Sequence, residues 1–445
     1  MIPIYKNDDA HSYLKAQQKE LNSGGGKLSD VVRELIETVR TSGDVGLQEI
    51  VRRLGDPLRA NFRLTEREIE DAVSRLPADR KSVIQRAADR IEAFASKIRA
   101  QLQPGRIDYD EFSVGFAFAA VESTACYVPG GNFPLPSTAL MTAITARVAG
   151  VRRILIVSPK LTDEVVYAGT LAGVKEFFQV GGAQAVAALA FGTESIPRVD
   201  MIVGPGNAYV TEAKRQLQGI VGIDALAGPS EIAVLADESA DPKLIAADLL
   251  SQAEHSPDAR AYLITSADSL IEPTICALTE LVSSTDVPTF IRESLENSAV
   301  LVFDSIDMCV EAVNEIAPEH LELHILQPQL VRNKLKNFGT LFLGVNSTVP
   351  FGDYMTGANH TLPTNRSARF AGALSPVTFL RIRNWIEVSS KPAGLVSDTM
   401  SFASIEGLSA HAEAARLRLF AETTNHYSSE MLRQSWNNVA FGFML

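Results

Sequence analysis

Short, largely apolar runs alternate with helical stretches through the middle of this chain, and this rhythm limits the folds it can adopt. The runs lie at 154–157, 201–203, 232–235 and 261–265. Continuous apolar runs of this length are typical of parallel strands that are buried on both faces. Because helical stretches separate them, they indicate successive strand–helix–strand units. We therefore expect an α/β fold built from two incomplete Rossmann-like, doubly wound units.

Composition narrows the range of partners and compartments. The 445 residues are enough for two or three domains. A formal net charge of -12 offers no positive field to nucleic acid, so a small-molecule substrate is expected. Three cysteines without metal-type spacing indicate a reducing compartment, and we find neither an export signal nor an apolar run of membrane length. We expect a cytoplasmic protein with no membrane partner.

Local motifs predict one helix start and two candidate nucleotide-binding turns. Thr65 followed by Glu68 predicts a capping box. The glycines and lysine at 24–27 are better interpreted as a flexible join than as a phosphate loop, because no strand precedes them. The turns at 181–184 (Gly-Gly-Ala-Gln) and 204–207 (Gly-Pro-Gly-Asn) would let backbone amides approach a phosphate. Ordinary strand–helix loops explain both turns equally well.

Four of the seven histidines lie in polar clusters that suit a metal ion. Gln252 and His255 are three apart in a run predicted to be helical, so both would leave one face of a helix. The other clusters are Glu319-His320, Asp353 with His360, and Glu406 with His411. Imidazole and carboxylate groups are typical zinc ligands, and a catalytic zinc site keeps one position open. Taken singly, each histidine is more simply a hydrogen-bonded or surface residue.

Glu319 and His320 follow a proline and could act as two separate proton acceptors. An imidazole that titrates near neutral pH and a carboxylate that orients water suit the oxidation of an alcohol followed by hydration of its product. A solvated loop pair is the alternative interpretation.

Eight motifs follow one another in order along the chain. They are Tyr-Val-Pro-Gly-Gly at 127–131, Gly-Gly-Ala-Gln-Ala at 181–185, Val-Gly-Pro-Gly-Asn at 203–207, Ala-Gly-Pro-Ser-Glu at 227–231, Ser-Gln-Ala-Glu-His at 251–255, Ala-Pro-Glu-His-Leu at 317–321, Gly-Asp-Tyr at 352–354 and Asn-His-Thr-Leu-Pro-Thr at 359–364. Together they resemble the histidinol dehydrogenase family over residues 30–420. The resemblance implies a zinc- and NAD-dependent alcohol dehydrogenase that ends histidine biosynthesis.

The resemblance also implies a role for each polar residue. One zinc ion per subunit would be bound by Gln252, His255, Asp353 and His411, the last supplied by the partner subunit of a domain-swapped homodimer with shared active sites. His320 would accept the hydroxyl proton, and Glu319 would activate water for the second of two NAD reductions. NAD would contact Tyr127, Gln184 and Asn207. The substrate would contact the zinc ligands together with Ser230, His320, His360 and Glu406.

Departures from the family's usual motifs concern the substrate pocket. Val349 stands where biosynthetic members usually carry an acid, which would remove a counter-ion for a cationic amino alcohol. Leu135 replaces a usual aromatic residue, Thr145 replaces a usual proline, and 374–379 also differ. These departures suggest an alternative, a paralogue that oxidises another vicinal alcohol such as sulfopropanediol. A non-catalytic metal- or nucleotide-binding homologue is the third hypothesis, against which the intact ligand and catalytic positions argue.

We expect five segments. They are an N-terminal arm (1–25), a discontinuous first Rossmann-like domain (26–125 and 231–373), a second Rossmann-like domain (126–230), a helical C-terminal arm that contributes to the partner's active site (374–426) and a poorly ordered tail (427–445). The tail lacks both helical periodicity and caps.

Cys126 offers a thiol that could carry the aldehyde step as a thioester, but no histidine is near it in sequence and a small buried hydrophobe is the better interpretation. Cys126→Ser should therefore leave the second oxidation step intact, as measured by the NADH formed per substrate molecule. A loss confined to the second step would show that the thiol takes part.

Overall fold

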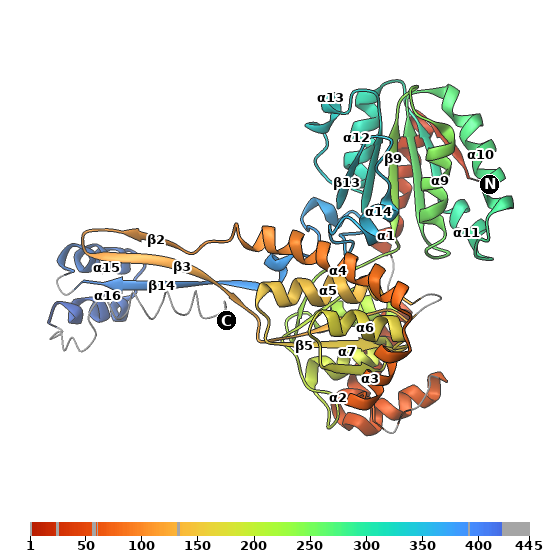
Figure 1. Ribbon diagram of the computed structural model, residues 1–445. Coiled ribbons are helices and arrows are strands. Elements are labelled where there is room, and N and C mark those ends of the chain that lie inside the picture. Colours follow the sequence, from red (N-terminus) through yellow and green to blue (C-terminus); the bar gives the residue numbers. More distant parts are fainter. Residues whose placement is uncertain are drawn as a thin grey trace. The chain divides into compact units, whose positions relative to one another are not determined.

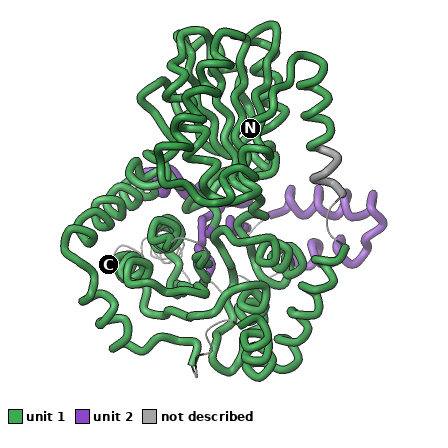
Figure 2. Tube along the Cα trace, turned by 90° about the vertical axis from the view of Figure 1, so that its right-hand side faces the viewer, with its two compact units in different colours: residues 1–96, 122–378 green, residues 97–121, 379–445 purple. Residues whose placement is uncertain are grey.

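The computed structural model describes residues 2–23, 26–55, 59, 61–130, 134–389 and 392–420 (Figure 1). They belong to two compact units, one within 1–96 and 122–378 and the other within 97–121 and 379–445 (Figure 2). Gly24, Gly25 and the predicted tail lie outside the described residues. No helix in the described ranges is long and apolar enough to cross a membrane.

Six parallel strands form the larger sheet of the first unit, in the order β1-β11-β10-β9-β12-β13. They are β1 (Ile4–Lys6), β9 (Glu231–Ala236), β10 (Arg260–Thr265), β11 (Ala299–Val302), β12 (His320–His324) and β13 (Thr340–Leu343). Alternate residues of β9 enter two different cores. One core includes α9 (Pro242–Ala253) and α10 (Ile271–Ser284), and the other includes α1 (Asp8–Ser23) and α12 (Ile306–Ile316). Helices therefore cover both faces of this sheet (Figure 1).

Five parallel strands form the second sheet, in the order β6-β5-β4-β7-β8. They are β4 (Ser123–Tyr127), β5 (Arg153–Ser158), β6 (Glu176–Gln179), β7 (Met201–Val203) and β8 (Gly222–Ile223). One core packs this sheet against α2 (Gly26–Leu54), α7 (Gly182–Phe191) and α8 (Ala208–Leu217). The remaining helices here are α3 (Glu66–Arg75), α4 (Ala78–Arg99), α5 (Pro136–Ala149) and α6 (Asp163–Leu171).

Both sheets share one connectivity. Numbered within its own sheet, each has the strand order 3-2-1-4-5, with β1 added at the edge of the larger sheet. This is the order of a Rossmann fold without its last strand. The prediction of an α/β fold with parallel sheets is confirmed, as are the strands expected from the four apolar runs, which are β5, β7, β9 and β10.

Two of the expected domain boundaries differ from the structure. Residues 1–25 are not an isolated arm, because β1 pairs in parallel with β11. The segment 26–125 does not join 231–373, since the apolar face of α2 is buried in the core of the five-stranded sheet and β4 is that sheet's central strand. Amphipathicity predicts that a helix buries one face, but not which sheet covers it.

The second unit has an antiparallel sheet in the order β14-β3-β2. Its elements are β2 (Gly105–Asp108), β3 (Phe112–Ala120), β14 (Leu380–Val388), α15 (Ala393–Ile405) and α16 (Ser409–Arg416). The expectation of a helical arm over residues 374–426 is therefore wrong at β14. Apolar residues alternate along it, as at Ile382 and Ile386, which is a strand signal that the prediction missed.

The predicted capping box is present at the start of α3: the Thr65 hydroxyl accepts from the Glu68 N–H, and the Glu68 carboxylate accepts from the Thr65 N–H. Thr65→Ala should lower the free energy of unfolding by about 1 kcal/mol, measured by urea denaturation. Thr279→Ala, at an exposed threonine inside α10, is the control and should change it by less than about 0.5 kcal/mol. Equal effects of the two substitutions would contradict a capping role.

Candidate active site

His320 begins β12 and is held in one tautomer by the neighbouring strand. Its Nδ1 lies 3.2 Å from the main-chain oxygen of Glu231, which can only accept, so Nδ1 carries the hydrogen. The Nε2 lone pair is thereby left free, buried without a hydrogen-bond partner among the described residues and 3.8 Å from the Asp353 carboxylate. Burial lowers the pKa of His320 to about 4. The ring is a neutral base at physiological pH.

Glu319 is fixed by the same strand. Its carboxylate accepts a hydrogen bond of 3.0 Å from the Glu231 N–H and another from the Ser230 side chain. Its side chain is almost fully buried, and this burial raises the pKa of Glu319 well above its usual value. A carboxylate in this environment is a stronger base than an exposed one.

Asp353 and His255 offer ligand atoms near His320, and Gln252 lies three residues before His255. Gln252 is fully buried in the last turn of α9, and neither its amide oxygen nor its nitrogen has a partner among the described residues. His255 Nδ1 lies 3.0 Å from the Ser251 oxygen, so its Nε2 lone pair is free, 3.9 Å from the Asp353 carboxylate. Helix α9 ends at Ala253, so the expected helical pair is only half right, because His255 lies just past the helix.

These groups fit a zinc ion. Two atoms that each lie about 2.1 Å from one ion are at most roughly 4.2 Å apart. The separation of His255 Nε2 from Asp353 is within that limit. A buried side-chain amide without partners costs about 1–3 kcal/mol unless a ligand satisfies it. An ion bound to Gln252 Oε1 would remove part of that cost.

His360 is the third imidazole whose tautomer is set by a main-chain carbonyl. Its Nδ1 lies 3.0 Å from the main-chain oxygen of Asp353, and its Nε2 lies 3.4 Å from the hydroxyl of Thr138 in α5. The Nδ1–H groups of His255, His320 and His360 thus all donate to main-chain carbonyls. The Nε2 lone pairs of His255 and His320 stay available, while that of His360 accepts from the Thr138 hydroxyl. Thr138 was missed by sequence reasoning, because only the tertiary structure brings α5 to this loop.

Tyr127 ends β4, Gln184 lies in the first turn of α7 after β6, and Asn207 caps α8 after β7. The Tyr127 hydroxyl accepts from the Gly182 N–H, and the Asn207 side chain caps α8. Gln184 is buried, and its amide nitrogen has no partner among the described residues. Gly204 has a φ of 109°, and a Cβ there would clash with the main-chain oxygen of Tyr127. These carboxyl ends of parallel strands are where dinucleotides bind in Rossmann folds.

Glu406 and His411 belong to the second unit. Glu406 caps α15 and His411 lies in α16, and both are exposed. That unit is described by itself, so the structure provides no geometry between these two side chains and the histidines of the first unit.

The substituted pocket positions have structural partners. Val349 is 1% exposed and packs in the core that contains Phe342 and α9, while its N–H donates to Glu322. Thr145 is buried, and its hydroxyl accepts from Asn359. The valine is therefore accommodated by apolar packing. Leu135 lies at the start of α5 and is partly exposed.

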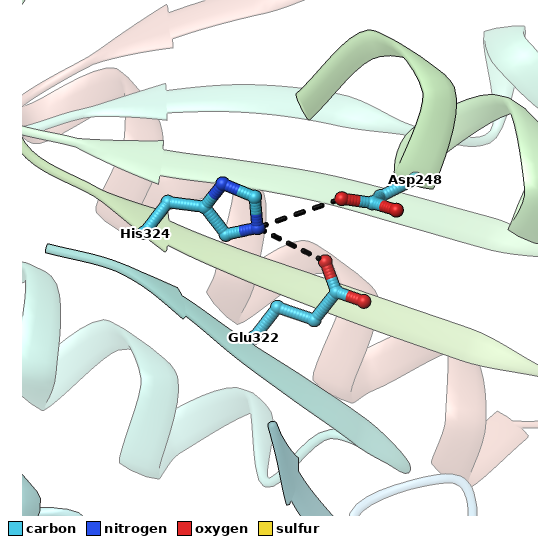
Figure 3. A group of neighbouring side chains, drawn as sticks. All are labelled: Asp248, Glu322 and His324. Carbon is cyan, nitrogen blue, oxygen red and sulfur yellow. Dashed lines mark ion pairs between the residues drawn. The ribbon is translucent and has the colours of Figure 1, made fainter. Parts of the chain in front are cut away.

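A buried cluster of Asp248, Glu322 and His324 was also missed (Figure 3). Burial raises the pKa of Glu322 to about 7. Burial lowers the pKa of His324, but the two carboxylates outweigh it and raise that pKa to about 9. The signal in the sequence was the repeat of polar residues at 320, 322 and 324 inside a strand.

Cys126 is fully buried, and burial raises the pKa of its thiol to about 12. The interpretation as a small buried hydrophobe is confirmed, since a nucleophilic cysteine needs an accessible thiolate.

Comparison with known proteins agrees with these features. The family model described as histidinol dehydrogenase matches residues 17–419. The histidinol dehydrogenase of Methanocaldococcus jannaschii is 38% identical, covering 91% of this chain and 96% of its own, and that of Caulobacter vibrioides is 40% identical, covering 94% and 98%. The crystal structure of the Elizabethkingia anophelis histidinol dehydrogenase has a TM-score of 0.86 at 32% identity, covering 94% of this chain and 98% of its own.

The match extends over nearly the whole chain in sequence and in fold. The chain therefore belongs to the histidinol dehydrogenase family, whose members are NAD-dependent oxidoreductases that act on an alcohol.

Proposed function

We propose that the protein oxidises L-histidinol to L-histidine in two successive hydride transfers to NAD. The observation that carries this proposal is the position of the Asp353 carboxylate, 3.9 Å from His255 Nε2 and 3.8 Å from His320 Nε2. Such an arrangement supplies both ligand atoms and a neutral base. A family of alcohol dehydrogenases provides the reaction class.

In this proposal zinc is bound by Gln252, His255 and Asp353, with His411 of the partner subunit as the fourth protein ligand. When bound, the ion orients the substrate and polarises its oxygen. The unpartnered amide of Gln252 supports this assignment. NAD binds at the turns of Tyr127, Gln184 and Asn207.

Each of the two oxidation steps uses a different buried base. The Nε2 atom of His320 takes the hydroxyl proton while the carbon gives its hydride to NAD, which leaves an aldehyde. Glu319 then takes a proton from the water that adds to the aldehyde, and a second hydride transfer yields the acid. Ser230, held against Glu319, and His360, held by Asp353, contact the substrate.

A homodimer would complete each site with Glu406 and His411 of the partner subunit. The second unit carries large exposed apolar side chains, among them Ile382 at 63%, Ile386 at 72% and Phe402 at 63% exposure. Apolar surface of this kind is typical of an interface. It supports the proposal that this unit packs against a second copy of the chain.

The zinc-loaded protein should form two NADH per L-histidinol, measured by absorbance at limiting substrate. Because Val349 packs in the core, its apolar side chain is compatible with a histidinol site. A panel of small diols and sulfonated diols is the comparison. Turnover of a sulfonated diol with none of L-histidinol would refute the proposed substrate and favour the paralogue.

Substitution of the two bases should separate the steps. His320→Asn should lower kcat for the alcohol step by roughly 10²–10⁴, the usual contribution of a general base. Glu319→Gln should still form the first NADH but accumulate aldehyde, which a carbonyl-trapping reagent detects. Glu311→Gln, at an exposed glutamate of α12, is the control and should behave as wild type. Formation of two NADH at the wild-type rate by Glu319→Gln would contradict its role.

A further inference from the structure

The buried cluster of Asp248, Glu322 and His324 has no role in the proposed steps (Figure 3). His324 Nε2 lies 3.5 Å from the Asp248 carboxylate and 3.3 Å from the Glu322 carboxylate. The side chains of Glu322 and His324 are 0% and 1% exposed. Charged groups this deeply buried are costly unless they are paired, so the three form one electrostatic unit.

The second oxygen of each carboxylate is bonded to the start of α14 (Val349–Tyr354). The Thr348 hydroxyl donates to Asp248 over 2.7 Å, and the Val349 N–H donates to Glu322 over 2.8 Å. Ion pairs and hydrogen bonds of the cluster thus connect three separate elements. Asp248 belongs to α9, Glu322 and His324 belong to β12, and Thr348 and Val349 stand at the start of α14.

Each of these three elements also carries a residue of the candidate site at a regular spacing from the cluster. In β12, His320 lies two residues before Glu322 and therefore on the same face of the strand. In α9, Gln252 lies one helical turn after Asp248. In α14, Asp353 lies one turn after Val349. A displacement of one element at the cluster would displace its site residue.

We infer that Asp248, Glu322 and His324 are positioning residues, which hold α9, β12 and α14 together so that Gln252, His320 and Asp353 converge on one ion and one substrate. This inference rests on the proposed zinc site. None of the three cluster residues needs to touch zinc or substrate.

A proton, rather than a second metal ion, holds the cluster together. Three atoms with lone pairs face one another, so Nε2 or a facing carboxyl oxygen carries a hydrogen. A histidine that binds metal almost always donates its other ring N–H to an acceptor. His324 Nδ1 is buried and has no partner among the described residues.

The test uses the full-length chain and measures the zinc dissociation constant by competition with a chromophoric chelator. Thr348→Val removes only the hydroxyl that links α14 to Asp248 and preserves the shape of the side chain. It should raise the dissociation constant about tenfold, the lower end of the effect of losing a group that helps to orient the ligands. His324→Leu should have a larger effect, and His324→Gln, which keeps a donor, should restore part of the affinity.

Leu323→Val is the matched control, because Leu323 lies in β12 but is buried in the core on the opposite face. It should lower the melting temperature of the zinc-free protein without changing zinc affinity by more than about twofold. Thr348→Val should instead weaken zinc binding without lowering the melting temperature of the zinc-free protein. It should also lower kcat more than it raises KM for L-histidinol. If Thr348→Val and His324→Gln bind zinc as wild type does, the positioning role is wrong.

Failure of the proposed zinc site gives a different result. Asp353→Asn should lose the zinc, and a wild-type protein that binds none, or an Asp353→Asn variant that keeps it, would refute that site itself. Two zinc ions per subunit, one of which is lost in His324→Gln, would overturn the inference by making the cluster a metal site.

Discussion

The parallel pairing of β9 with β12 fixes the geometry of the site. In this pairing His320 lies opposite Ile232, which is the residue after Glu231. The main chain of Glu231 therefore donates to the Glu319 carboxylate and accepts from the His320 ring. Two main-chain groups of one residue thus orient both bases. Because the anchoring groups belong to the main chain, strand register sets their positions, and they in turn hold the side chains of both bases in place.

Main-chain hydrogen bonds and burial set the tautomers and the charge of the histidines at the site. Carbonyl groups bond Nδ1 of His255, His320 and His360, so the tautomer of each ring is set by the backbone. Burial keeps His320 neutral, because a charged imidazole in that position would lose its hydration. The site therefore combines ligand atoms that face one carboxylate with a base that is available at physiological pH.

The local features of the fold could be predicted from the sequence, and the long-range placements could not. Apolar runs correctly predicted β5 and β9, because a strand that is buried on both faces is apolar along its whole length and this is visible in the sequence alone. The pairing of β1 with β11 joins segments nearly 300 residues apart in sequence, so no periodicity indicates it. The same limit applies to α2, whose buried face is visible in the sequence but whose covering sheet is not.

At the site, the spacing of Gln252 and His255 predicted them as a pair on one helix face, although the helix ends between them. The approach of Asp353 and of Thr138 depends on tertiary packing and was not predictable from spacing. The roles of Tyr127, Gln184, Asn207, Glu406 and His411 came from family resemblance alone and stay predictions. The cluster at Asp248 was overlooked because each of its members, taken singly, resembles an ordinary polar residue.

The most direct test of the account is anomalous diffraction at the zinc edge from crystals of the zinc-loaded, full-length protein. The account predicts one peak per subunit, bounded by Gln252 Oε1, His255 Nε2 and the Asp353 carboxylate, with no peak between Asp248, Glu322 and His324. A peak in that buried cluster, or none beside Asp353, would contradict it.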